Sequence, residues 1–75
     1  MTIREAYRMA ELDEVIGDLH SIERTEVGLL ALIGQVSVLL PGELAGKLSG
    51  LVGKRIGILR YEGYHVRCLD GEKHA

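Results

Sequence analysis

The 75-residue sequence predicts a small, mainly β domain with two short helices, in the order α-β-β-β-α-β-β. Three observations support this fold class. Apolar residues alternate with period two over several segments, a Gly-Gln pair separates two such segments as a hairpin turn does, and leucines spaced for one helix face follow the third segment. We expect a helix at about 3–12, a five-stranded barrel at about 14–70 and a flexible tail at 71–75, all in one domain.

Composition narrows the class of protein. Hydrophobic residues make up 47% of the chain, which is enough for a folded core and too much for a disordered segment. Cys68 is the only cysteine, so no intrachain disulfide can form, and a small secreted domain would usually need one. The charged start is unlike a signal peptide, and the longest uncharged run, 27–42, contains Gly, Gln, Ser and Pro. We therefore expect a cytoplasmic protein that has no contact with membranes.

The first predicted element is a helix at about 3–12. Thr2 followed by Glu5 fits a capping box, in which each side chain satisfies a free backbone N–H. The apolar residues that follow lie at i, i+3, i+4 and i+7, which is one stripe of a helix: Ile3, Ala6, Tyr7 and Ala10.

The next three elements are strands at 15–20, 27–33 and 36–40. Gly17 lies inside the first strand, where a glycine indicates a bend or the close approach of another backbone. The charged run at 23–26 is interpreted as the first turn. Gly34-Gln35 is interpreted as a two-residue hairpin turn, with positive φ at Gly34.

This hairpin has two apolar faces. The turn places Ile33 opposite Val36, Ala31 opposite Val38 and Leu29 opposite Leu40, all on an inner face. The reverse face carries Leu30, Leu32 and Leu39 together with Ser37, although an exposed face of an antiparallel sheet is normally polar. We expect either the N-terminal helix, through Ile3 and Tyr7, or a second subunit to cover these leucines.

A second helix and a second hairpin complete the chain. Apolar residues at i, i+4, i+7 and i+8 predict a helix at about 43–52: Leu44, Leu48, Leu51 and Val52. Strands at 54–60 and 64–69 follow, joined by a three-residue loop at 61–63 that places Ile58 opposite Val66 and Ile56 opposite Cys68. The outer face then receives Arg55, Leu59, His65, Arg67 and Leu69, while Arg60 and Tyr64 pair at the rim. The alternative turn, Glu62-Gly63, would pair Ile58 with Arg67.

This order of elements resembles the OB-fold, a five-stranded Greek-key barrel, over about residues 14–70. The resemblance rests on three strands, a bridging helix and two strands, with a glycine inside the first strand. SH3-like barrels are the alternative, although they commonly lack a full helix at that place. The OB-fold resemblance implies ligand binding across the second and third strands. Here that surface offers leucines, whereas single-stranded nucleic acids require stacking aromatics and a cationic groove.

Charge is unevenly distributed, which leaves nucleic-acid binding as the alternative function. The net charge is −2, but residues 47–67 contain five bases and one acid, whereas residues 1–26 contain three bases and seven acids. The candidate contacts for nucleic acid are the basic and aromatic residues of the last hairpin: Arg55, Arg60, Tyr61, Tyr64 and Arg67. Aromatic residues beside a turn and charged residues on an edge strand are also ordinary hairpin chemistry, and we favour that interpretation.

The sequence shows no pattern for catalysis, a metal or a cofactor. His65 and Cys68 are three apart on a strand and therefore point to opposite faces. The acidic residues lack the spacing of a calcium loop, and Gly53-Lys54 lacks the glycine-rich lead-in of a phosphate loop. A barrel of this size is filled by its own side chains, so no small-molecule substrate is expected. The sequence predicts a non-enzymatic interaction module that self-associates or docks on a protein partner through Leu30, Leu32 and Leu39.

Overall fold

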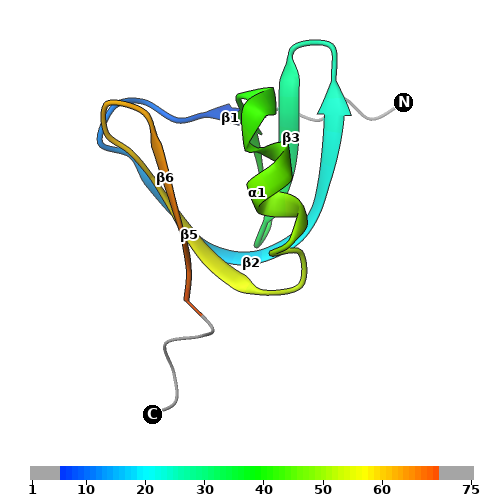
Figure 1. Cartoon of the computed structure of the whole chain (residues 1–75). Coiled ribbons are helices and arrows are strands. Elements are labelled where there is room, and N and C mark those ends of the chain that lie inside the picture. Colours follow the sequence, from blue (N-terminus) through cyan, green and yellow to red (C-terminus); the bar gives the residue numbers. More distant parts are fainter. Residues whose placement is uncertain (1–5, 70–75) are drawn as a thin grey trace.

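A computed structural model describes residues 6–69, which form a curled sheet of six strands and one short α-helix (Figure 1). The elements are β1 (Tyr7–Arg8), β2 (Glu14–Thr25), β3 (Gly28–Ile33), β4 (Val36–Leu40), α1 (Ala45–Ser49), β5 (Arg55–Arg60) and β6 (Tyr64–Cys68). The sheet order is β1-β4-β3-β2-β5-β6. The mainly β class is confirmed, but the expected five strands and two helices are replaced by six strands and one helix.

The sheet curls because β2 changes partner along its length. Residues 14–18 pair with β5, and residues 19–25 pair with β3. Gly17 lies at this change, where an added Cβ would be 3.2 Å from Ile33 Cγ2 and 3.3 Å from the Gly34 nitrogen. The predicted close approach at Gly17 is therefore confirmed. Figure 1 shows the result as two arms of one half-barrel that meet along β2.

The turn predicted at 23–26 is wrong. β2 continues to Thr25, and the turn follows at Glu26 and Val27. Charged residues did not break the strand because they lie on a ladder that is open to solvent, with Glu23 paired to Leu30 and Arg24 to Leu29. The hydroxyl of Thr25 closes the turn by donating to the Gly28 carbonyl and accepting from the Val27 N–H.

Both predicted hairpin registers are confirmed. In the first, Ile33 pairs with Val36, Ala31 with Val38 and Leu29 with Leu40 across a turn where Gly34 has a φ of 62°. In the second, Ile56 pairs with Cys68, Ile58 with Val66 and Arg60 with Tyr64, so the loop has three residues. These registers follow from local turn chemistry and from matched apolar faces, which are both visible in a sequence.

The predicted N-terminal helix is wrong over residues 6–12, the part of it that the structure describes. Residues 1–5, including Ile3, lie outside the described residues, as does the predicted tail at 71–75. Tyr7 and Arg8 instead form β1, parallel to β4. Met9 follows and is only 2% exposed, whereas Ala6 and Ala10 are exposed. The predicted helix stripe contained two alanines, which bury little surface, and the strand arrangement buries the long Met9 side chain instead.

The second helix is shorter than predicted. A 3₁₀ turn at Gly42–Leu44 leads into α1, and residues 50–53 form turns. Leu48 is fully buried and Leu44 and Leu51 are half-buried, but Val52 is 43% exposed. The helix packs on the arm that contains β3 (Figure 1), and the core includes Met9, Leu19, Leu29, Ala31, Ile33, Val38, Leu40, Leu48, Ile56 and Ile58. No helix within residues 6–69 is long and apolar enough to cross a membrane.

Candidate interaction surface

The leucine face is the outer surface of β3 and β4, formed by Leu30, Leu32 and Leu39. Leu30 pairs with Leu39, and Leu32 pairs with Ser37, so these side chains lie together on one side of the hairpin. The alternate residues Leu29, Ala31 and Val38 point inward and have no exposure. The three outer leucines are half-buried. The structure thus places the predicted leucines on one face, and the hairpin is apolar on both sides.

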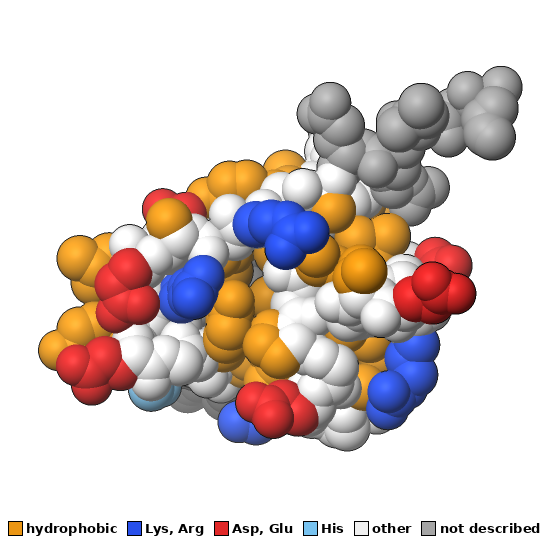
Figure 2. Space-filling model, turned by 90° about the horizontal axis from the view of Figure 1, so that it is seen from above, with side chains coloured by type: hydrophobic (Ala, Val, Ile, Leu, Met, Phe, Trp, Pro, Cys, Tyr) orange, Lys and Arg blue, Asp and Glu red, His pale blue; other side chains and the backbone are white. Residues whose placement is uncertain are grey.

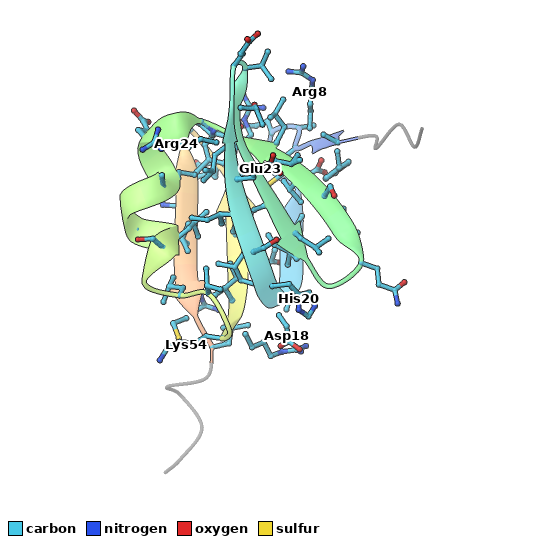
Figure 3. All side chains as sticks on the ribbon, turned by 90° about the vertical axis from the view of Figure 1, so that its right-hand side faces the viewer. Arg8, Asp18, His20, Glu23, Arg24 and Lys54 are labelled. Atoms are coloured by element: carbon cyan, nitrogen blue, oxygen red, sulfur yellow. The ribbon has the colours of Figure 1, made fainter. Side chains whose placement is uncertain are left out.

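Residues 6–12 do not cover the leucine face as a helix. Tyr7 pairs with Val38, which places it on the inner side of the sheet, and it remains 40% exposed. Figure 3 views the outer side of β3 and β4 and shows no helix in front of them. Within residues 6–69, the cover that we expected from this segment is therefore absent, and Ile3 lies outside the described residues.

Tyr7 has a different role, since its side chain forms a hydrogen bond that connects β1 to the residue before β2. Its hydroxyl donates to the carboxylate of Asp13, which also accepts from the Ala10 N–H at 2.8 Å. The hydrogen bond from Tyr7 and then that from Ala10 lower the pKa of Asp13. The same hydrogen bond to Asp13 raises the pKa of Tyr7. This contact holds the segment that leads into β2 and so helps to place β1 beside β4.

Two charged residues flank the leucine face. Arg8 of β1 pairs with Leu39, and Glu23 of β2 pairs with Leu30. Both are exposed, and within residues 6–69 neither side chain forms a hydrogen bond or an ion pair. Figure 3 shows Glu23 on the side of the sheet that faces the viewer and Arg24 turned toward the helix. The sequence alone did not show this flanking because Arg8 was expected on a helix.

The five candidate nucleic-acid contacts do not form one surface. Arg60 and Tyr64 pair at the inner rim, where the guanidinium carbon lies 5.3 Å from the centre of the Tyr64 ring. Arg60 also donates to the carbonyl oxygen of Met9. Arg67 pairs with Gly57 on the outer side of the other arm.

The remaining two candidates are also separated. Arg55 lies on that outer side, 4.0 Å from a carboxylate oxygen of Asp18. Tyr61 is in the loop between β5 and β6 and is 50% exposed. Basic residues that the sequence places close together are therefore divided between two faces of a strand pair.

A hollow of about 300 Å³ adjoins the leucine face at the end of the molecule where β1 lies. Its lining includes Arg8 and Leu39 together with Arg60 and Tyr64. Figure 2 looks down on this end and shows hydrophobic side chains in the middle of the face, with cationic and acidic side chains around them. The leucine face therefore continues into a partly apolar, partly cationic rim.

The described chain offers no arrangement typical of a metal centre. Within residues 6–69, no three His, Cys, Asp or Glu side chains lie close enough to hold a metal ion. Cys68 is a half-buried free thiol opposite Ile56 on the inner face, and His65 is opposite Leu59 on the outer face. The predicted opposite orientation of His65 and Cys68 is confirmed.

Comparison of the chain with protein-family models, with curated proteins and with solved structures finds no match. The candidate function therefore depends on the physical character of the surface itself.

Proposed function

We propose that the protein is a non-enzymatic interaction module that self-associates or docks on a protein partner through the leucine face. One observation carries this proposal: β3 and β4 are apolar on both sides. An antiparallel sheet that meets water on one side normally has polar residues there. Leu30, Leu32 and Leu39 alternate with the fully buried inner residues, so they cannot all turn inward without a shift in register.

We also propose that the fold is an OB-like small barrel. The long β2 pairs with β3 on one side and with β5 on the other, and α1 connects β4 to β5. This is the order expected for a partly open Greek-key barrel. In the OB plan, ligands bind across the strands that correspond to β3 and β4, which carry the leucine face here. β1 is an addition to that plan and lies at the edge of β4.

The chemistry of the leucine face favours a protein over other ligands. Burial of a whole leucine side chain contributes about 1.5–3 kcal/mol, and half-buried leucines retain only part of that gain. Because association itself has a large entropic cost, three such leucines are insufficient unless other contacts surround them. We therefore expect an affinity that depends on both the leucines and the flanking polar residues.

Size-exclusion chromatography with light scattering tests this function. The wild type is expected to elute with a mass above the 8.2 kDa of one chain, or to retain a protein from its native host that Leu32→Asp does not retain. Leu59→Asp is the matched control, because Leu59 is a 36% exposed leucine on the outer side of the other arm. Circular dichroism must show that both variants are folded. Equal behaviour of the two variants would overturn the proposal.

A further inference from the structure

We infer that the leucine face binds a second copy of the chain, packed face to face about a two-fold axis that runs parallel to the strands. This inference rests on the proposed function and makes it specific. It comes from a row of four residues that crosses the sheet: Arg8, Leu39, Leu30 and Glu23. Arg8 pairs with Leu39, Leu39 with Leu30, and Leu30 with Glu23.

The row is self-complementary. It begins with a cation on β1, continues through two leucines and ends with an anion on β2. A two-fold axis that lies between β4 and β3 and parallel to them reverses the strand order in the second copy. Arg8 then faces the partner's Glu23, Leu39 faces the partner's Leu30, and Glu23 faces the partner's Arg8. An isologous interface forms each of these contacts twice.

The charges select this axis over the alternative. A two-fold axis in the interface but perpendicular to the strands would place Arg8 over the partner's Arg8 and Glu23 over the partner's Glu23. Like charges that face each other across an interface are unfavourable. Packed sheets lie about 10 Å apart, which an arginine and a glutamate can span together. Their strands also stay roughly aligned, as the parallel axis requires.

The neighbouring row fits the same arrangement. Ser37 pairs with Leu32, and Leu32 pairs with Ser21. Under the same axis Leu32 faces the partner's Ser37, a small side chain that leaves room for a leucine. Ser37 is only 8% exposed, and no side-chain N or O atom that is buried within residues 6–69 lacks a hydrogen-bond partner. A serine at this position therefore brings only one small hydroxyl group to the interface.

The lack of a partner for Arg8 and Glu23 among the described residues supports an ion pair between two copies of the chain. Arg8 and Glu23 are both exposed, and neither side chain has an ion-pair or hydrogen-bond partner among the described residues. Strands in a sheet are about 4.8 Å apart, so three strand intervals separate Arg8 from Glu23 by roughly 14 Å within one copy. That separation is too long for an ion pair within the chain. The second copy brings the two groups together.

Charge reversal tests the arrangement by sedimentation equilibrium. Arg8→Glu and Glu23→Arg each replace two attractive pairs with two repulsive ones, so each variant should self-associate at least tenfold more weakly than the wild type. An equimolar mixture of the two variants restores opposite charges at both contacts and should recover association. The double variant Arg8→Glu/Glu23→Arg should also recover it. Arg24→Glu is the matched control because Arg24 is adjacent in sequence but faces the helix.

The outcomes separate this inference from the proposed function. If Leu32→Asp abolishes self-association but the single reversals and their mixture behave like the wild type, the leucine face is the interface and the two-fold arrangement is wrong. If the wild type is a monomer at all concentrations, the second copy is excluded as the occupant. Loss of association in the single variants that the mixture does not reverse would also overturn the pairing of Arg8 with Glu23. Circular dichroism of each variant excludes unfolding as the cause.

Discussion

Replacing Met9 with alanine tests whether the N-terminal segment is a strand that completes the core. Met9 is 2% exposed and belongs to the core, although the helix predicted from the sequence did not place it on the buried stripe. Alanine removes three heavy atoms beyond Cβ, which at about 0.8 kcal/mol per methylene gives roughly 2.4 kcal/mol before any cavity term. With a partly collapsed cavity, the expected loss is about 2–4 kcal/mol.

The assay is urea unfolding followed by far-ultraviolet circular dichroism, since the chain contains no tryptophan. A chain of this length has a stability of about 4–11 kcal/mol, so the unfolding midpoint of the variant should fall by a large fraction of the wild-type value. With a slope of about 1–2 kcal/mol/M, the expected shift is about 1–4 M urea. Met9→Leu conserves volume and should cost less than about 1.5 kcal/mol.

Ala10→Asp provides the contrast that separates a strand from a helix. Ala10 is exposed in the structure but would lie on the buried stripe of the predicted helix. The strand arrangement therefore predicts a change within about 0.5 kcal/mol, as for most surface substitutions. A larger loss of unfolding free energy for Ala10→Asp than for Met9→Ala would refute the placement of β1.

Further predictions concern the bend of β2 at Gly17, the hydrogen bond between Tyr7 and Asp13, and binding of nucleic acid. Gly17→Ala places a Cβ 3.2 Å from Ile33 Cγ2 and should cost about 1–3 kcal/mol, seen as a lower melting temperature; an unchanged melting temperature would contradict the tight bend. An NMR titration should show Asp13 with a pKa below 3.8. This pKa should rise in Tyr7→Phe, because phenylalanine cannot donate the hydrogen bond that stabilises the carboxylate. Because folding lowers the pKa of Asp13, this contact stabilises the fold fully above the pKa of Asp13 in the unfolded chain, and the stabilisation is lost as pH falls through the pKa in the folded chain. An identical titration of Asp13 in the wild type and in Tyr7→Phe would exclude the contact. A labelled single-stranded oligonucleotide should not bind strongly at physiological salt, and tight binding that Arg60→Ala weakens would reverse our preference between the two functions.

The strands and their registers could be predicted because the determining features are local. Gly34-Gln35 sets the first hairpin turn, and alternation with period two then fixes which residues face inward. The N-terminal segment could not be predicted in this way. The spacing of its apolar residues fits one stripe of a helix. In the structure, however, Tyr7 and Arg8 pair with the edge of β4, which is far away in the sequence. Pairing between segments far apart in sequence leaves no periodic signal in either of them.

The leucine face could be predicted for the same local reason, whereas its charged borders could not. Leu30, Leu32 and Leu39 alternate out of step with the inner residues, so a register fixed by one turn assigns them to the other face. Arg8 and Glu23 join the same row only because β1 and β2 lie on opposite sides of the hairpin. Alternation along β5 and β6 divides the charges of the last hairpin between two faces, as the predicted register already implied.

A methyl NMR dilution series on leucine-labelled protein shows whether the leucine face binds a second copy. If the leucine face binds a second copy, the methyl signals of Leu30, Leu32 and Leu39 should shift together as the protein is concentrated. The signals of Leu59, which lies on the outer side of the other arm, should stay fixed. Concentration-dependent shifts at Leu59 with constant signals from the leucine face, or no shift at any leucine over the full range, would contradict the account.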